Sequence, residues 1–106
     1  GAMRLVQARV SPAERDDLLD QAVALLRRMT AAGVVHGDLS PYNLLVWQGR
    51  LYAIDMPQAV HPNRNPNGLD FLHRDVVNTL GWFQRKGAKV DPEALFAELL
   101  EDALMV

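Results

Sequence analysis

A short polar segment, residues 36–43 (HGDLSPYN), constrains the fold of this chain most strongly. It interrupts an apolar stretch that begins at Val34 and ends at Val46. Its histidine, aspartate, serine and asparagine would be costly to bury without hydrogen-bond partners. The apolar flanks, in contrast, belong in a core. We therefore expect a loop that is anchored at both ends and turns its polar side chains toward one cleft.

A long amphipathic helix is predicted before this segment, over residues 12–32. Ser11 and Glu14 form the pattern of a capping box, and Pro12 suits the first turn of a helix. Gly33 supplies a left-handed residue at which such a helix stops. The apolar positions between them recur every three or four residues: Leu18, Leu19, Ala22, Val23, Leu25, Leu26 and Met29.

Two short β-prone runs follow the polar segment, at residues 44–46 and 51–54. The sequence between them, WQGR, suits the turn of an antiparallel hairpin. Residues 56–67 hold three prolines and three asparagines. Such a composition predicts that the chain leaves the hairpin into a loop.

Two further helices are predicted after this loop. Asn65 before Pro66 is expected to cap the first, whose apolar residues keep helical spacing up to Gly87. Asp91 before Pro92 opens the last helix. The expected order is helix, polar loop, hairpin, loop, helix and helix, which is an α+β fold that is mainly α.

Length, charge and cysteine content exclude several classes of protein. The 106 residues suffice for one hydrophobic core, and a net charge of -2 with no basic run beyond Arg27 and Arg28 gives no nucleic-acid signal. No apolar run is long enough to cross a membrane. The absence of cysteine fits a reducing compartment, so we expect the cytoplasm. Residues 1–3 (GAM) look like the remnant of an expression tag, which leaves residues 4–106 as one partial domain.

Three oxygen-bearing side chains are expected to converge beside the polar segment. Asp38 and Asn43 are five residues apart within it, and Asp55 ends the second β-prone run. Because a hairpin returns its far end close to where it began, Asp55 is expected beside Asn43. A carboxylate and an amide oxygen suit Mg²⁺, and a second carboxylate can orient or deprotonate a hydroxyl. Phosphoryl transfer needs these parts.

The polar segment fits the kinase catalytic-loop pattern H-R-D-L-x-x-x-N at every fixed position except one, where Gly37 replaces the arginine. The HGD variant is typical of atypical protein kinases and small-molecule kinases. Together with AIDMPQAV and LDFLHRDVVNTLGWF, which follow it, the segment resembles the RIO family of atypical serine/threonine-protein kinases and ATPases. The distinguishing features are Ser40, the I-D-x-P-Q sequence and the pair Arg74 and Asp75. The resemblance runs from about residue 11 to residue 87.

This resemblance implies a role for each candidate residue. Asp38 would be the catalytic-loop aspartate, and Asn43 and Asp55 would hold Mg²⁺ while the γ-phosphate of ATP is transferred. The family is also linked to a phosphoaspartate intermediate, which would make Asp55 a nucleophile as well as a ligand. The remaining candidates, His36, Ser40 and Asp75, would support the loop. Asp75 would do so by accepting hydrogen bonds from the loop backbone with its carboxylate.

Against the family pattern, these residues contain no G-x-G-x-x-G loop, no V-A-I-K-type lysine and no helix with its partner glutamate. The chain therefore resembles the C-terminal lobe of a kinase-like fold without its N-lobe. Its partners would be ATP, an unknown phosphoacceptor and that missing lobe. We expect the isolated chain to be inactive, and we expect an apolar patch near residues 44–46 through which it self-associates.

Several other interpretations remain open. A small-molecule kinase of the aminoglycoside or choline type shares the H-G-D-x-x-x-x-N pattern but usually carries another residue at position 40. A kinase-like lobe that serves only as an interaction module is a second alternative. A metal hydrolase is a third, with ligands His36, Asp38, Asp55 and His61. Taken one at a time, Asp38 and Asn43 could also be simple turn residues that bind local amides. His61 and His73 are most simply solvent-facing residues.

Overall fold

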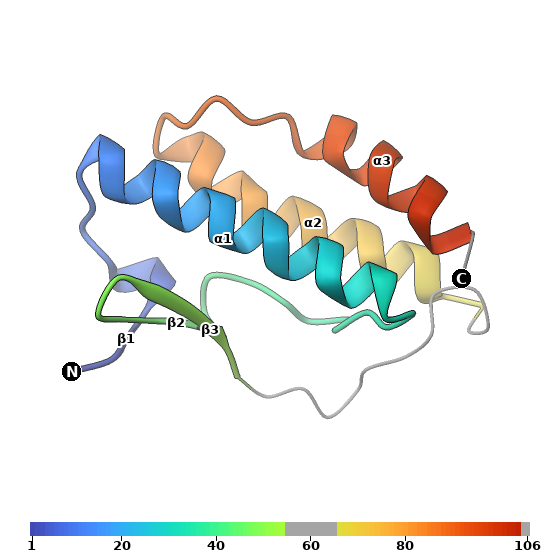
Figure 1. Ribbon diagram of the computed structural model, residues 1–106, viewed down its shortest axis with the longest axis horizontal. Coiled ribbons are helices and arrows are strands. Elements are labelled where there is room, and N and C mark those ends of the chain that lie inside the picture. The colour runs from blue at the N-terminus through green and yellow to red at the C-terminus, as the bar shows by residue number, and fades with distance from the viewer. Residues whose placement is uncertain (55–65, 105–106) are drawn as a thin grey trace.

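A layer of three helices lies over a small sheet in the computed structural model, which describes residues 1–54 and 66–104 (Figure 1). The helices are α1 (Pro12–Ala31), α2 (Gly68–Arg85) and α3 (Pro92–Leu104). Successive helices run antiparallel to each other. The segment that leaves α1 turns back beneath the helices toward the sheet, so the polar loop lies between the two layers (Figure 1). This arrangement confirms the α+β, mainly α prediction.

The sheet is antiparallel, with the strand order β1-β2-β3. The predicted hairpin is confirmed by β2 (Leu44–Trp47) and β3 (Arg50–Ala53). Its turn is shorter than expected, because the end residues of the two strands pair and leave only Gln48 and Gly49 between them. Both turn residues have positive φ, 50° and 74°, as a tight two-residue hairpin requires.

Strand β1 (Met3–Arg4) forms one edge of the sheet. Its Met3, one of the tag-like residues 1–3, pairs with Val46 of β2. A short 3₁₀ helix, η1 (Leu5–Gln7), follows β1, and its Leu5 is fully buried. The described chain from Met3 to Gln7 is therefore part of the fold, and the assignment of residues 1–3 to a tag remnant stays a prediction.

Local sequence signals fix the ends of α1 and α3. The Ser11 hydroxyl accepts from the Glu14 amide at 3.2 Å, and the Glu14 carboxylate accepts from the Ser11 amide at 2.9 Å, which confirms the capping box. Gly33 has a φ of 77° beyond the end of α1, as predicted. At the start of α3, the carboxylate of Asp91 accepts from the amide of Glu93 at 3.1 Å.

The start of α2 differs from the prediction. The helix begins at Gly68 with Asn67 in the N-cap position, two residues after the expected cap. Asn65, the residue predicted to cap it, lies outside the described residues. Two asparagines flank Pro66, and the sequence pattern alone does not decide between them.

The core lies between the helix layer and the sheet. Both ends of the polar loop are anchored in it, since Val35, Leu39 and Leu44 are fully buried. This is the arrangement that the apolar flanks predicted. The helices contribute most of the other large, fully buried side chains: Leu26, Leu72, Val76, Leu80, Phe83 and Leu99.

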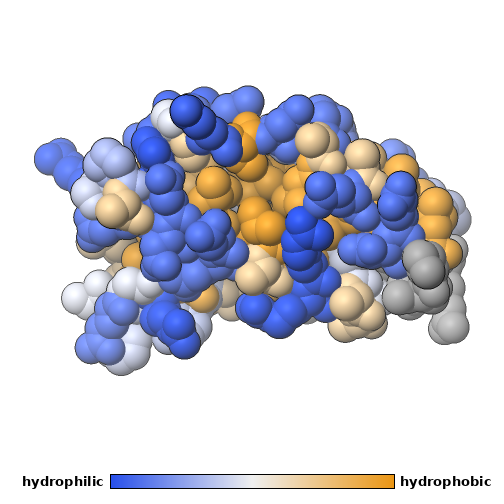
Figure 2. Space-filling model, turned by 45° about the horizontal axis from the view of Figure 1, so that its top comes forward, coloured by the Kyte–Doolittle hydropathy of each residue, from blue (hydrophilic) through white to orange (hydrophobic). Residues whose placement is uncertain are grey.

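Polar side chains cover most of the surface, and apolar side chains gather in the middle of the face shown in Figure 2. The apolar patch predicted near residues 44–46 is not formed by these residues themselves. Leu44 is buried, and Leu45 and Val46 are half-buried. The large exposed apolar side chains nearby are Met3, Tyr42, Trp47 and Tyr52. Within the described ranges, no helix combines the length and the apolar character needed to cross a membrane.

Candidate functional site

The polar loop is bound to one buried carboxylate on α2. Asp75 is only 1% exposed, and it accepts hydrogen bonds from the backbone amides of His36 at 3.0 Å, Gly37 at 2.8 Å and Leu39 at 2.9 Å. Burial raises the pKa of Asp75, while the three amide bonds and the nearby His36 act in the opposite direction. These three amides fix the backbone on both sides of Asp38.

His36 is buried and connects the loop to the end of the hairpin. Its Nδ1 accepts from the amide of Asp38 at 3.1 Å, and its Nε2 lies 3.4 Å from the carbonyl oxygen of Ile54. This pattern corresponds to the neutral tautomer with the proton on Nε2. Both ring nitrogens face protein groups, which argues against the metal hydrolase that used His36 as a ligand. His61, another ligand of that alternative, lies outside the described residues.

Arg74 holds the same loop from the adjacent position on α2. Its guanidinium donates to the carbonyl oxygen of Gly37, and it lies 5.0 Å from the centre of the Phe71 ring. Gly37 itself has a φ of +89°, a conformation that favours glycine over residues with a side chain. The glycine that departs from the H-R-D pattern is thus required by the backbone here.

Asn43 closes the loop from within. Its side-chain oxygen accepts from the amide of Ser40 at 2.8 Å, and its side-chain nitrogen donates to the carbonyl oxygen of Asp38. The hydroxyl of Ser40 accepts from the amide of Tyr42 at 3.2 Å. A carbonyl oxygen has two lone pairs, so the Asn43 oxygen keeps one for a further partner.

Asp38 is the exposed acidic residue of this loop. Its backbone is bonded to His36 and Asn43, while its side chain lies at the surface. No hydrogen bond or ion pair to the Asp38 carboxylate is found among residues 1–54 and 66–104. The loop therefore fixes the backbone of one aspartate and leaves its carboxylate accessible to a substrate.

The hairpin returns beside Asn43, as far as the structure describes it. The amide of Ile54 donates to the carbonyl oxygen of Asn43 at 3.0 Å. Asp55, the next residue and the third member of the expected constellation, lies outside the described residues. In the described part of the chain, no group of three histidine, cysteine, aspartate or glutamate residues is arranged to hold a metal ion.

Three contacts of the site region were missed from the sequence. The bond from Arg74 to Gly37 is one, although the Arg74 and Asp75 pair was noted as a motif. The amide of Val6 donates to Pro41 at 3.0 Å, so η1 supports the outer side of the loop. His73, expected in solvent, instead lies 2.7 Å from a carboxylate oxygen of Glu93 and joins α2 to α3. No local sequence signal predicts these contacts, because their partners are distant along the chain.

Comparison with known proteins identifies the fold and its relatives. Residues 1–95 match the family model described as the RIO domain. The RIO-type serine/threonine-protein kinase Rio1 of Haloferax volcanii is 46% identical over 71 residues, covering 67% of this chain and 24% of the relative. Rio1 of Thermoplasma acidophilum is 40% identical over 80 residues, covering 76% and 42% respectively. The chain thus spans well under two thirds of these relatives.

A solved structure supports the fold assignment. The Rio2 kinase of Chaetomium thermophilum, in a complex described as ADP/Mg²⁺-phosphoaspartate, matches with a TM-score of 0.69 at 22% identity. The match covers 91% of this chain and 33% of the Rio2 chain. At this identity the similarity establishes a common fold.

Proposed function

This chain belongs to the RIO family, and from that premise we propose that it forms the catalytic-loop side of a phosphotransfer site. The observation that carries the proposal is the contrast within the loop. The backbone around Asp38 is held by the buried Asp75, while the Asp38 carboxylate is exposed. Phosphoryl transfer depends chiefly on positioning and on charge stabilisation, so a rigid loop with one accessible carboxylate suits it.

In the proposed mechanism, Asp38 orients and deprotonates the hydroxyl that receives the phosphoryl group. The bonds of His36 and Asn43 hold the Asp38 backbone in place, so that its carboxylate would start from a fixed position near that hydroxyl. Ser40 has a structural part, since its hydroxyl accepts a backbone amide of the same loop. The acceptor is a protein serine or threonine by analogy with the relatives, which are named serine/threonine-protein kinases.

We assign Asn43 and Asp55 as the residues that hold Mg²⁺, and ATP as the phosphoryl donor. Amide and carboxylate oxygens are the donors that Mg²⁺ prefers, and the Asn43 oxygen has a free lone pair for it. When bound, the ion neutralises charge that develops on the phosphates. The Rio2 complex holds ADP, Mg²⁺ and a phosphoaspartate. This supports a second role for Asp55, as a nucleophile that accepts the phosphoryl group.

The chain alone is proposed to be inactive and to self-associate. Its 106 residues include no glycine-rich phosphate loop and no V-A-I-K-type lysine. ATP hydrolysis by the chain should therefore be no faster than by its Asp38→Asn variant. Tyr42, Trp47 and Tyr52 are 62%, 45% and 46% exposed and offer an apolar contact surface. A clean monomer at high concentration in sedimentation would contradict self-association.

Paramagnetic NMR tests the proposed site even if binding is weak. Mn²⁺ replaces Mg²⁺ in many such sites, and its unpaired electrons broaden signals of nearby amides at low occupancy. With MnADP, we expect broadening of the amide signals of residues 36–40, 42 and 43; Pro41 has no amide proton. The Asp55→Asn variant should lose this broadening, whereas Asp20→Asn, an exposed aspartate on α1, should retain it.

The same experiment separates the enzyme from a non-catalytic interaction module. Broadening that spreads evenly over the acidic surface residues and is the same in Asp55→Asn as in the wild type would favour the interaction module. It would overturn the proposed site. Retained broadening in Asp38→Asn together with loss in Asp55→Asn would agree with a separate role for Asp38 away from the metal.

A further inference from the structure

A groove runs from the catalytic loop along the surface of α2. Its volume is about 460 Å³. The loop forms one wall, and the second half of α2 forms the other. The exposed Asp38 stands at one end, so a molecule lying in the groove reaches the proposed phosphotransfer site. The polar and aromatic residues that line it are Asp38, Ser40, Tyr42, Asn78, Trp82 and Arg85.

The α2 wall is a single stripe of the helix. Asn78, Trp82 and Arg85 are spaced by four and three residues, which places them on one face. Arg74, which binds the loop at Gly37, lies one turn earlier on the same face. The backbone around Asp38 is bonded to Asp75, and the Arg85 guanidinium lies beside Gly81. At a rise of about 1.5 Å per residue, Asp75 and Gly81 are about 9 Å apart along the helix axis. This span matches about three residues of an extended peptide.

The far end of the groove is positively charged. Arg85 is exposed, and none of the described residues forms an ion pair with it. Its guanidinium folds back along α2, because a Cβ atom at Gly81 would lie only 3.1 Å from an Arg85 nitrogen. The ammonium of Lys86 lies 5.5 Å from the centre of the Trp82 ring. The absence of a side chain at Gly81 thus lets Arg85 lie against the groove wall.

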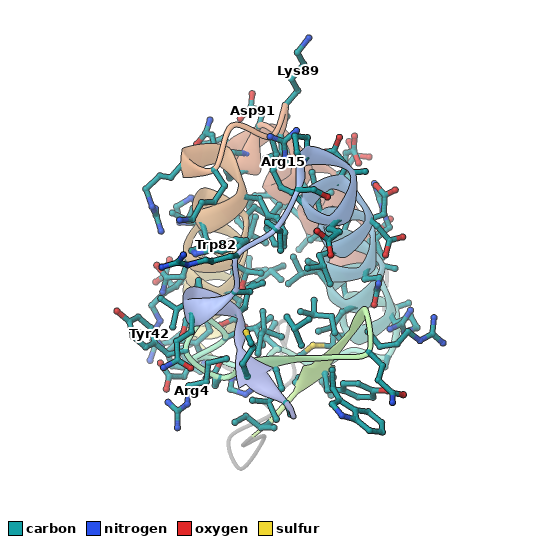
Figure 3. All side chains as sticks on the ribbon, turned by 90° about the vertical axis from the view of Figure 1, so that its left-hand side faces the viewer. Arg4, Arg15, Tyr42, Trp82, Lys89 and Asp91 are labelled. Atoms are coloured by element: carbon teal, nitrogen blue, oxygen red, sulfur yellow. The ribbon has the colours of Figure 1, made fainter. Side chains whose placement is uncertain are left out.

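Other charged side chains lie around the same flank of the molecule. Figure 3 shows Tyr42 and Trp82 on one side, with Arg4 below them and Arg15, Asp91 and Lys89 toward the top. Arg15 is paired with Asp16. Arg85, in contrast, lines the groove without an ion pair to any of the described residues. Cations at the end of α2 also suit the helix dipole. That effect does not require a guanidinium to line a groove that leads to Asp38.

We propose that this groove binds the phosphoacceptor segment of a protein substrate and that Arg85 selects an acidic residue about three positions from the acceptor hydroxyl. The proposal rests on the phosphotransfer function proposed above and adds its substrate class. The acceptor hydroxyl lies at Asp38, the chain extends past Tyr42 and Asn78, and a carboxylate meets Arg85 beside Trp82. A basic residue at that position is rejected by like charge.

Peptide binding to the chain, without nucleotide, tests the proposal. The probes are two peptides with one central serine, which carry either glutamate or lysine three positions away on both sides. Binding is measured by NMR titration, followed at Asn78 and at the Trp82 indole. We expect the glutamate peptide to bind about tenfold more tightly. The preference should invert in Arg85→Glu and weaken in Arg85→Gln.

A matched control is Arg50→Glu, which makes the same charge change on β3 outside the groove. It should leave the peptide preference within about twofold of the wild type, apart from a general effect that salt removes. An equal loss in Arg50→Glu and Arg85→Glu would show nonspecific attraction and overturn the proposal. Far-UV circular dichroism of each variant verifies that it is folded.

Two further outcomes are distinct. If a single-stranded RNA oligonucleotide binds the groove more tightly than the glutamate peptide and with the same Arg85 dependence, the groove is a nucleic-acid site and the proposal is wrong. If the peptide preference is observed but MnADP does not broaden residues 36–43, the phosphotransfer function fails and the acidic-peptide site stands. If MnADP broadens residues 36–43 but the peptides show no charge preference, the acidic-peptide site is wrong and the phosphotransfer function stands.

Discussion

Two carboxylates in this molecule accept backbone amides in very different surroundings. Glu14 is exposed at the start of α1 and accepts from Ser11, three residues away. Asp75 is buried under the polar loop, residues 36–43, and accepts from three amides, 36 to 39 residues away. The hydrogen bonds of Glu14 lower its pKa, whereas burial raises the pKa of Asp75 despite its larger number of bonds.

The difference separates local from tertiary control of structure. The capping box at α1 is complete within four residues, so it works wherever the helix forms. The polar loop depends instead on Asp75 of α2, which accepts hydrogen bonds from its backbone. The geometry around Asp38 is therefore a product of the whole fold, and disturbing Asp75 should have a larger and more local effect on function than disturbing Glu14.

The largest expected effect is that of Asp75→Asn. The amide keeps the shape of the side chain but replaces one accepting oxygen with a donor, which leaves buried loop amides without a partner. We expect the free energy of unfolding to fall by about 3 to 5 kcal/mol. Denaturant titration measures this loss. Hydrogen exchange at the amides of His36, Gly37 and Leu39 should accelerate more than exchange elsewhere.

Asp70→Asn is the matched control on the same helix. Asp70 is exposed in the first turn of α2, so its replacement should cost less than about 1 kcal/mol. It should also leave exchange in the catalytic loop unchanged. Similar losses for Asp70→Asn and Asp75→Asn would show that the loop does not depend on the buried carboxylate.

The next effect is expected at His36. Phenylalanine fills most of its volume but provides no partner for the Asp38 amide or the Ile54 carbonyl. His36→Phe should lower the free energy of unfolding by about 1 to 2 kcal/mol and speed exchange of the Asp38 amide. His73→Phe is the control: its ring is half-exposed beside Glu93, and its loss should cost below about 1 kcal/mol. A larger loss for His73→Phe than for His36→Phe would contradict the role of His36 in holding the loop.

The same contrast explains what the sequence could predict. The ends of α1 and α3 follow from signals within a few residues, Ser11 with Glu14 and Asp91 with Pro92. Strand β1 depends on pairing with Val46, more than forty residues away. Helix α2 begins two residues later than the sequence Asn65-Pro66 predicts, with Asn67 in the N-cap position but no cap hydrogen bond from its side chain.

The candidate site divides in the same way. The residue types at Asp38 and Asn43 and their spacing were visible in the sequence and indicated the loop. The sequence alone gave Asp75 no connection to that loop; the family resemblance supplied it. Arg74 was visible as part of a motif, but its bond to Gly37 depends on how α2 packs. The position of Asp55 in space stays a prediction, because it lies outside the described residues.

A smaller effect is expected at the exposed capping box. Ser11→Ala removes the hydroxyl that accepts from the Glu14 amide and should lower the free energy of unfolding by about 1 kcal/mol. Exchange should accelerate in the first turn of α1 and not in residues 36–43. Ser11→Asp restores an acceptor at the N-cap and should recover most of the loss. Faster exchange in the catalytic loop of Ser11→Ala would show that the two regions are coupled.

The smallest effect is in the pH dependence of stability, where the two carboxylates should differ in sign. Glu14→Gln keeps an oxygen for the Ser11 amide but does not titrate. Because the folded pKa of Glu14 is lowered, its stabilisation is complete above the ordinary glutamate pKa of about 4.3 and is lost as pH falls through the folded value. The wild type should therefore approach Glu14→Gln in stability in acid.

Because the pKa of Asp75 is raised, the advantage of the wild type over Asp75→Asn should instead shrink as pH rises from about 3.9 through the folded value. Denaturant titrations at several pH values measure both differences, and equal signs for the two would contradict the opposite effects of exposure and burial.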